Sequence, residues 1–276
     1  LVERGKLRYN DPVSTYIPSF GTGASSAITV HDLLTHTSGL RINSLFLDPP
    51  LEKPTLQLEA ARFGDVGPRA AVGAAYSYSN PGYNTLGAVI EIASGKPLDR
   101  FLDDEIYDRL GMGDTYHHET AAALGEKLTR MGAVYYRRDS TTRQWIPGWK
   151  PGDAPTVPFV RASGGLISTA ADYALFLQTF LNGGTYGDVR IISPESVRRM
   201  TTSHTPAGGP AYGYGWSVDG DGVYSHGGSD GTFAWVDPAR GIIGMVLTQT
   251  PRGENPRRQF VELVNRSILH DVSGSR

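Results

Sequence analysis

A tyrosine, a serine and an asparagine stand together at Tyr78-Ser79-Asn80, immediately before an apolar run with helical spacing. A tyrosine at the start of a helix and close to cationic groups can be held as a phenolate, which can act as a general base. An asparagine two residues on offers both a donor and an acceptor to a carbonyl or a lysine. The alternative is a polar turn with Asn80-Pro81-Gly82 at its tip. The motif alone leaves both interpretations open.

A second group of candidate residues is the segment His226-Gly227-Gly228-Ser229. Small residues after a polar residue at a sheet edge let a substrate lie along the strand, because larger side chains would block it. The backbone N–H of Ser229 could then point at an oxyanion. A glycine-rich turn without a catalytic role is the alternative.

The same segment also contains GGSDG at residues 227–231, which matches the G-x-S-x-G pattern of a nucleophile elbow centred on Ser229. That elbow needs a strand before the serine and a helix after it. The residues that follow, TFAWV, are typical of a strand, which disfavours the elbow. A further motif, THTSGL at residues 35–40, is typical of the end of a short helix and its cap, which is a structural role.

The composition argues against several classes of function. The 276 residues carry a formal net charge of -2 and no basic block, so we expect no nucleic-acid partner. The apolar stretches are too short to cross a bilayer, so no transmembrane segment is expected. The absence of cysteine excludes disulfides and thiol nucleophiles, and the seven histidines show no metal-ligand spacing. We therefore predict no metal and no cofactor.

The elements that would position the candidate residues follow from capping residues, apolar spacing and terminating glycines. The predicted helices cover residues 30–36, 55–63, 83–93, 97–112, 170–182 and 193–200, and Asn255 and Pro256 open a last helix. The predicted strands cover 212–218, 232–238 and 241–249, of which the last two form an antiparallel hairpin. Helices first and sheet last predict an α+β architecture, with a helical region beside a sheet flanked by helices.

Taken in order, several blocks of the chain resemble the β-lactamase-related serine hydrolases, among them ITVHDLLTHTSGL, YSYSNPGYNTLGAVIEIASGKPL, ASGGLISTAADYALFL, YGYGWSV and HGGSDGTFAWVDP. That superfamily includes class C β-lactamases, D-alanyl-D-alanine peptidases and β-lactamase-like carboxylesterases. The resemblance runs over nearly the whole chain and implies a β-lactamase/penicillin-binding-protein-like fold. We expect residues 1–209 to form a predominantly helical region with the Tyr-x-Asn loop. Residues 210–276 would supply sheet strands and a C-terminal helix, and the two regions together would be part of one catalytic unit.

The resemblance also implies roles for individual residues. Tyr78 would be the general base, alone or paired with a lysine, and Asn80 would orient that lysine or the substrate amide. The strand with His226, Gly227 and Gly228 would face the substrate, and the N–H that follows would be one oxyanion donor. Histidine in place of the family's lysine on this strand leans towards esterases and peptidase-like proteins over efficient β-lactamases.

One element of the family pattern is absent from this sequence. No serine among the 276 residues has a lysine three positions on, whereas the family places Ser-x-x-Lys on the helix just before the segment that matches LVERGKL. The resemblance therefore implies that the nucleophile helix, its lysine and the amino-terminal strands lie outside these residues. We expect an exposed sheet edge, which predicts self-association or instability of this chain. The family leans towards periplasmic or exported proteins, and some esterase members are cytoplasmic.

Three functions remain open from the sequence. The first is a serine hydrolase that forms an acyl-enzyme with a small-molecule ester, β-lactam or peptide, represented here without its nucleophile segment. The second is a catalytically inactive relative that acts as a binding or structural module. The third is an esterase with Ser229 as its nucleophile.

Overall fold

The computed structural model of the protein describes residues 1–40, 45–137, 141–142, 144–251 and 256–273. Its α-helices are α1 (Val30–Leu34), α2 (Leu56–Val66), α3 (Asn80–Ser94), α4 (Leu98–Leu102), α5 (Asp108–Leu110), α6 (Ala170–Leu181), α7 (Pro194–Met200) and α8 (Arg257–Ser273). Its strands are β1 (Tyr116–His117), β2 (Tyr135–Arg137), β3 (Trp145–Pro147), β4 (Leu166–Ile167), β5 (Thr185–Tyr186), β6 (Val189–Arg190), β7 (Ser217–Val218), β8 (Tyr224–Gly227), β9 (Phe233–Asp237) and β10 (Ile242–Val246). The last predicted helix, which was expected to begin at Asn255 and Pro256, corresponds to α8, and Asn255 itself lies outside the described residues.

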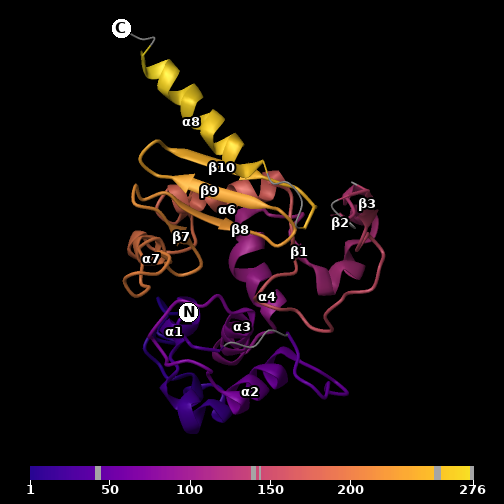
Figure 1. The fold of residues 1–276 in the computed structure, drawn as a ribbon, viewed down its shortest axis with the longest axis vertical. Coiled ribbons are helices and arrows are strands. Elements are labelled where there is room, and N and C mark those ends of the chain that lie inside the picture. The colour runs from indigo at the N-terminus through magenta and orange to yellow at the C-terminus, as the bar shows by residue number, and fades with distance from the viewer. Residues whose placement is uncertain (41–44, 138–140, 143, 252–255, 274–276) are drawn as a thin grey trace.

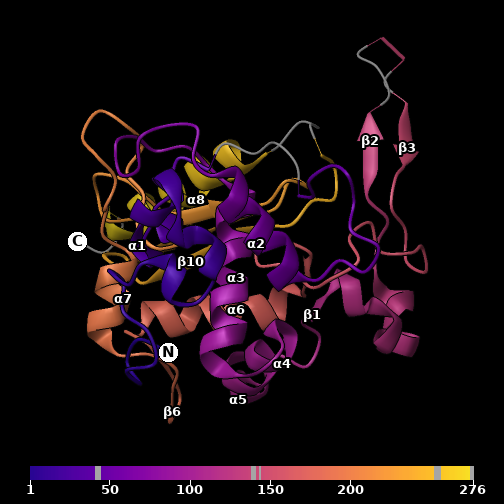
Figure 2. The same ribbon diagram turned by 90° about the horizontal axis from the view of Figure 1, so that it is seen from below.

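The elements form two parts, which Figure 1 shows one above the other. The helices α1, α2 and α3 gather in one part, and a four-stranded antiparallel sheet in the order β10-β9-β8-β7 forms the other. Strand β1 pairs with β4 and β5 with β6 in short two-stranded sheets, and the β2–β3 hairpin extends away from the body (Figure 2). The predicted α+β architecture is confirmed.

Helix α3 shows why the helical part forms where it does. Ser79 caps its N-terminus by accepting a hydrogen bond from the Gly82 N–H, Pro81 stands in its first turn, and Gly95 ends it in the left-handed conformation. Its buried face packs into a core made of residues from the first hundred positions, including Phe20, Ile28, Leu33, Phe63, Leu86 and Val89. The start of α3 is therefore fixed both by its cap and by the core beneath it.

A second core holds the sheet. Helix α6 packs against β9 and β10, and its Leu177 and Phe180 lie in one cluster with Trp216 and Tyr224. Because α6 precedes residue 209 and these aromatic residues follow it, one core joins both sides of the predicted boundary between residues 209 and 210. The division of the chain at that boundary stays a prediction.

The segment predicted as a strand over residues 212–218 forms a strand only at its end. Gly215 has φ 87°, and the Gly213 N–H donates to the Trp216 carbonyl, so the chain folds back and Tyr212 lies opposite Ser217. The predicted alternation survives in burial, since Tyr212, Tyr214 and Trp216 are all buried. The prediction of a continuous strand was wrong because the glycines permit a turn that alternation does not reveal.

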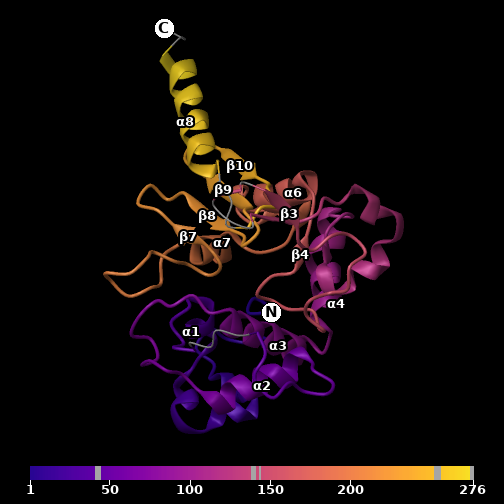
Figure 3. The ribbon, with the colours of Figure 1, turned by 45° about the vertical axis from the view of Figure 1, so that its right-hand side comes forward.

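The predicted hairpin is confirmed, with β9 paired to β10 from Phe233 opposite Val246 to Asp237 opposite Ile242. Strand β10 lies at one end of the sheet order, and none of the described strands pairs with its outer side. Helix α8 leaves the sheet beside it and extends away from the body (Figure 3). Self-association through this edge stays a prediction. Within the described residues, every helix is too short or too polar to cross a membrane.

Candidate functional site

Tyr78 lies in the loop that enters α3. Asn80, Pro81 and Gly82 form the first turn of that helix, so the alternative of a polar turn with these residues at its tip was wrong. The reason is Ser79, whose hydroxyl caps the helix and also donates to the Leu40 carbonyl at 2.8 Å. Ser79 is buried, and Asn80 is exposed on the helix's first turn. The serine between the two candidate residues is thus structural.

The phenol of Tyr78 is 53% exposed, and one face of its ring is covered by an imidazole. The ring centroids of Tyr78 and His36 lie 4.1 Å apart at an interplanar angle of 32°. The ring of His226, from the other part of the molecule, lies 6.3 Å from that of Tyr78. The structure therefore brings together Tyr78 and His226, two residues 148 positions apart that the sequence predicted to share a site.

His226 is half-buried on β8, a central strand of the sheet. Its Nε2 shares a hydrogen bond of 3.2 Å with the hydroxyl of Tyr212. Burial lowers the pKa of His226, because a charged imidazole loses solvation there. At neutral pH this histidine is therefore an uncharged ring that can donate or accept a hydrogen bond, and it supplies no fixed positive charge.

The residues after Gly227, which ends β8, form the turn between β8 and β9. Gly227, Gly228 and Ser229 are exposed, and the Gly228 N–H donates to the Thr232 carbonyl at 2.8 Å. A Cβ at Gly228 would lie 2.2 Å from the Thr232 hydroxyl oxygen, so a larger residue there would require the Thr232 side chain to move. Because strands stand on both sides of Ser229, the strand-then-helix geometry of a nucleophile elbow is not formed.

The N–H of Ser229 is in a position to act as a donor. It has no hydrogen-bond partner among the residues that the structure describes, and the residue is exposed at the end of β8. An exposed backbone N–H beside a glycine can approach an oxygen of a bound ligand closely. Its predicted role as an oxyanion donor stays a prediction.

The charge state of Tyr78 differs from the one that general-base chemistry needs. Partial burial raises the pKa of Tyr78, and the described part of the chain places no cation beside the phenol to counter this. Burial also raises the pKa of the neighbouring Tyr76 and Tyr212. With these neighbours alone, the Tyr78 phenol is protonated at neutral pH and can donate a hydrogen bond.

Sequence reasoning missed two residues of this cluster, His36 and Tyr212. The ring centroids of Tyr212 and His36 lie 5.1 Å apart, and the Tyr212 hydroxyl shares a hydrogen bond with His226. The ring of His36 contacts that of Tyr78 directly. The THTSGL motif that contains His36 was assigned only a structural role. The signal that could have found it is a histidine placed between two threonines at the end of a short helix, where a polar ring has no local partner.

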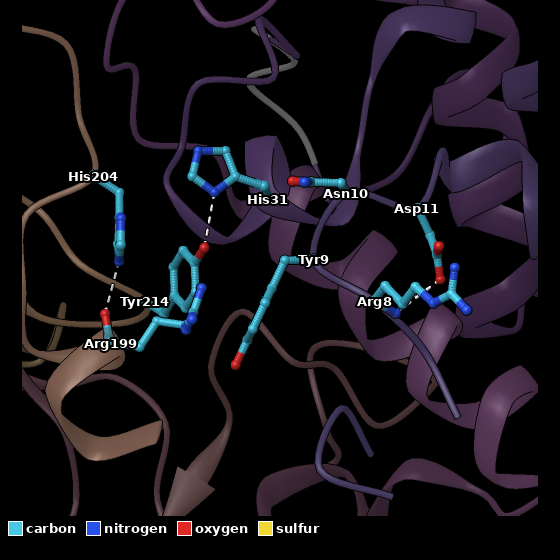
Figure 4. Close-up of a pocket in the computed structure, with 8 residues that line it drawn as sticks. All are labelled: Arg8, Tyr9, Asn10, Asp11, His31, Arg199, His204 and Tyr214. Carbon is cyan, nitrogen blue, oxygen red and sulfur yellow. Dashed lines mark hydrogen bonds between the residues drawn. The ribbon is translucent and has the colours of Figure 1, made fainter. Parts of the chain in front are cut away.

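A cavity of about 630 Å³ lies elsewhere, at the junction of the two parts (Figure 4). Its lining residues are Arg8, Tyr9, Asn10, Asp11, His31, Arg199, His204 and Tyr214. Figure 4 shows that Tyr214 lies beside both imidazoles; its ring stacks on that of His204 at 4.5 Å, and its hydroxyl meets His31 Nδ1 at 2.8 Å. Arg199 lies over the ring of Tyr9 at 5.2 Å. None of the predicted site residues lines this cavity, so it is separate from the cluster around Tyr78.

Among the described residues, no cluster of three histidine, aspartate or glutamate side chains has the arrangement of a metal site. The polar groups that the described residues bring to the Tyr78 cluster are phenols, neutral imidazoles and the backbone N–H groups of the β8–β9 turn.

Comparison with known proteins gives a consistent result. A family model described as Beta-lactamase matches residues 1–264. A protein named "Putative D-alanyl-D-alanine carboxypeptidase" from Escherichia coli (strain K12) is 26% identical over 91% of this chain. The match covers 65% of that protein, so the chain spans about two thirds of the length of this curated relative.

Solved structures show the same likeness. The octameric penicillin-binding protein homologue from Pyrococcus abyssi is 28% identical, with a TM-score of 0.70 over 93% of this chain and 59% of its own. The penicillin-binding protein from Bacillus halodurans, at 22% identity, shares the fold with a TM-score of 0.72 over 92% of this chain and 76% of its own. The predicted penicillin-binding-protein-like fold is thereby confirmed.

Proposed function

The chain belongs to the Beta-lactamase family, and on that premise we propose that it is part of a serine hydrolase that forms an acyl-enzyme with an ester or amide. The observation that carries this proposal is the meeting of Tyr78, just before α3, and His226, near the end of β8, whose ring centroids lie 6.3 Å apart. Two residue types that the family's chemistry uses, from regions distant in sequence, thus lie in one cluster, in which the Tyr78 phenol is exposed.

In the proposed mechanism Tyr78 takes the proton of a serine hydroxyl as the serine attacks the substrate carbonyl. Asn80 orients the substrate or a lysine, and the N–H of Ser229 donates to the oxyanion that forms. The attacking serine needs a lysine three residues on, and no such pair occurs in these 276 residues. The mechanism therefore requires a segment beyond this sequence. An ammonium brought near Tyr78 would also lower the pKa that burial raises.

His226 bears on the substrate class. Its ring is uncharged at neutral pH and shares a hydrogen bond with Tyr212, so His226 itself offers a carboxylate no permanent cation. A carboxylate-bearing substrate, such as a β-lactam or the peptide that the name of the E. coli relative implies, is best bound by a fixed positive charge. We therefore favour an uncharged ester or amide, in a carboxylesterase-type reaction, over β-lactam or D-alanyl-D-alanine hydrolysis.

The second candidate is an inactive relative that uses the same cluster to bind a ligand. The absence of Ser-x-x-Lys from the 276 residues favours it. The two candidates differ in one measurable respect, because only the hydrolase forms a covalent bond with an acylating reagent. An esterase with Ser229 as nucleophile has no such support, since Ser229 lies in a hairpin turn.

The test is intact-mass analysis after exposure to a fluorophosphonate and to a labelled penicillin. We expect no adduct on the 276-residue chain and a fluorophosphonate adduct on the complete product of its gene, at the serine of a Ser-x-x-Lys. In that product Tyr78→Phe should slow labelling by roughly 10²- to 10⁴-fold, the usual contribution of a general base. Tyr76→Phe is the matched control, because it removes a hydroxyl two residues away that has no role in the mechanism.

Each other outcome is informative. An adduct on a serine within residues 1–276 would refute the assignment of the nucleophile to another segment. A complete gene product that binds ligand without forming an adduct would favour the inactive relative. Equal loss of labelling in Tyr78→Phe and Tyr76→Phe would show that Tyr78 is not the base.

A further inference from the structure

His36 has an unusual backbone and burial. Its φ is 58°, the one positive value for a non-glycine residue among the described positions, and its side chain is 1% exposed. It follows α1 directly, with Thr35 and Thr37 on either side. Histidine and asparagine tolerate this left-handed conformation better than most residues, but a buried polar ring there still needs a reason.

The contacts of His36 bracket Tyr78. The backbone carbonyl of His36 accepts from the Ser77 N–H at 2.8 Å, and its Nδ1 accepts from the Ser79 N–H at 3.0 Å. The residues on both sides of Tyr78 are thus held by one residue 42 positions earlier in the chain. Its ring also lies against the ring of Tyr78 at 4.1 Å. Backbone and side chain of His36 together fix the conformation from which the phenol projects.

The imidazole is itself held from the other side. The ring of Tyr83 stacks on it at 4.6 Å and 22°, and the Tyr83 hydroxyl donates to the Leu34 carbonyl at 3.0 Å. His36 therefore stands between the rings of Tyr78 and Tyr83. A shift of the imidazole would disturb both the loop and the first turn of α3.

The protonation state follows from these contacts. Because Nδ1 accepts a hydrogen bond, the single proton of the neutral ring is on Nε2. Burial, with a smaller contribution from the nearby His226, lowers the pKa of His36 to about 3. His36 therefore stays neutral and keeps one tautomer through the range in which hydrolases work. It does not exchange protons with a substrate, since its side chain has no access to solvent.

We propose that His36 is the positioning residue of Tyr78: its Nδ1 and carbonyl clamp the backbone on both sides of the phenol, and its ring supports the phenol face. The importance of this position for catalysis rests on the proposed function, whereas the clamp itself does not. The clamp predicts that removing the Nδ1 acceptor loosens the loop and exposes the phenol to more water. The pKa of Tyr78 then falls towards the ordinary tyrosine value of about 10.

The test separates the acceptor from the ring. His36→Asn keeps an acceptor near the Nδ1 position and tolerates the positive φ, whereas His36→Phe keeps the ring and removes the acceptor. His117→Asn is the matched control, since His117 is another buried histidine but does not contact the Tyr78 loop. NMR of the 276-residue chain records two quantities, the exchange protection of the Ser79 amide and the titration of Tyr78, whose signal is assigned with Tyr78→Phe.

We expect His36→Phe to lose Ser79 amide protection and to lower the pKa of Tyr78. His36→Asn should keep the protection and most of the raised pKa, and His117→Asn should change neither. Equal changes in His36→Asn and His36→Phe, or no change in either, would overturn the proposal. If His36→Phe does not fold, His36→Asn decides alone: loss of Ser79 protection in that folded variant also overturns it.

A second readout distinguishes this proposal from the proposed function. In the complete gene product, fluorophosphonate labelling should be slower in His36→Phe than in His36→Asn. If the unaltered product is never labelled, the proposed function fails while the NMR result on the clamp stands. If labelling occurs and the two variants have equal rates, His36 does not position Tyr78 for the reaction and this proposal fails.

Discussion

The two sides of the candidate site are built in opposite ways. On the Tyr78 side, a buried histidine and a buried capping serine hold the loop through hydrogen bonds to the N–H groups of Ser77, Ser79 and Gly82. On the β8–β9 side, exposed small residues form a turn closed by backbone hydrogen bonds, from the Gly228 N–H to the Thr232 carbonyl and from the Gly231 N–H to the Gly228 carbonyl. A side chain is held in one orientation by polar contacts with residues distant in the sequence. A backbone N–H is accessible to a ligand mainly when the neighbouring side chains are small.

The largest expected effect comes from the buried imidazole of the Tyr78 side. Because the folded-state pKa of His36 is about 3 and the ordinary value is 6.5, the unfolded chain binds a proton more readily below pH 6.5. Stability therefore falls as pH falls through this window, by about 1.4 kcal/mol per pH unit from this group. Between pH 7 and pH 4 the free energy of unfolding should fall by roughly 3 kcal/mol more in the unaltered chain than in His36→Asn, as measured by urea unfolding at each pH.

The comparison is sharpened by making the same change on the other side. His226→Asn should also flatten the pH dependence of unfolding, because burial lowers the pKa of His226, but by less, since that ring is only half-buried. Parallel pH curves for His36→Asn and the unaltered chain would contradict the neutral, buried state of His36. If the pH dependence of the free energy of unfolding were weaker in His226→Asn than in His36→Asn, the contrast between the two sides would be reversed.

The two serines give the next largest effect. Ser79→Ala removes the cap of α3 and leaves the Leu40 carbonyl without its donor, so it should destabilise the chain by about 2 kcal/mol. Ser229→Ala lies in an exposed turn and should change stability by less than about 0.5 kcal/mol. Urea midpoints of the two variants measure the difference directly. Comparable losses would mean that the β8–β9 turn is held as firmly as the Tyr78 loop.

What the sequence could predict is mostly local. The helices predicted at residues 30–36 and 83–93, which form as α1 and α3, and the β9–β10 hairpin all depend on residues close together, and all are confirmed. The prediction that Tyr78 and His226 lie in one site came from the resemblance to a family, because neither segment contains a pattern that indicates contact with the other.

The clamp could not be predicted for the same reason. The bond from the Ser79 N–H to His36 joins residues 43 positions apart, and the positive φ of His36 becomes visible only in three dimensions. The failed strand at residues 212–218 makes a related point. Alternating aromatic residues revealed which side chains are buried, but Gly213 and Gly215 let the backbone turn where alternation suggested a straight strand.

The smallest predicted effect tests whether the two sides are coupled. Tyr212 contacts a residue of each side, since its ring centroid lies 5.1 Å from that of His36 and its hydroxyl shares a hydrogen bond with His226. Tyr212→Phe keeps the ring and removes only the hydroxyl, so it should lower the free energy of unfolding by about 1 kcal/mol.

Double-mutant cycles test the coupling. The double variant Tyr212→Phe/His226→Asn should lose less stability than the sum of the losses in the two single variants, because both changes remove the same hydrogen bond. In a cycle with His36→Asn they should add within about 0.5 kcal/mol, because the contact with His36 is made by the ring that Tyr212→Phe retains. Additivity in the His226 cycle would show that the hydroxyl does not join the two sides.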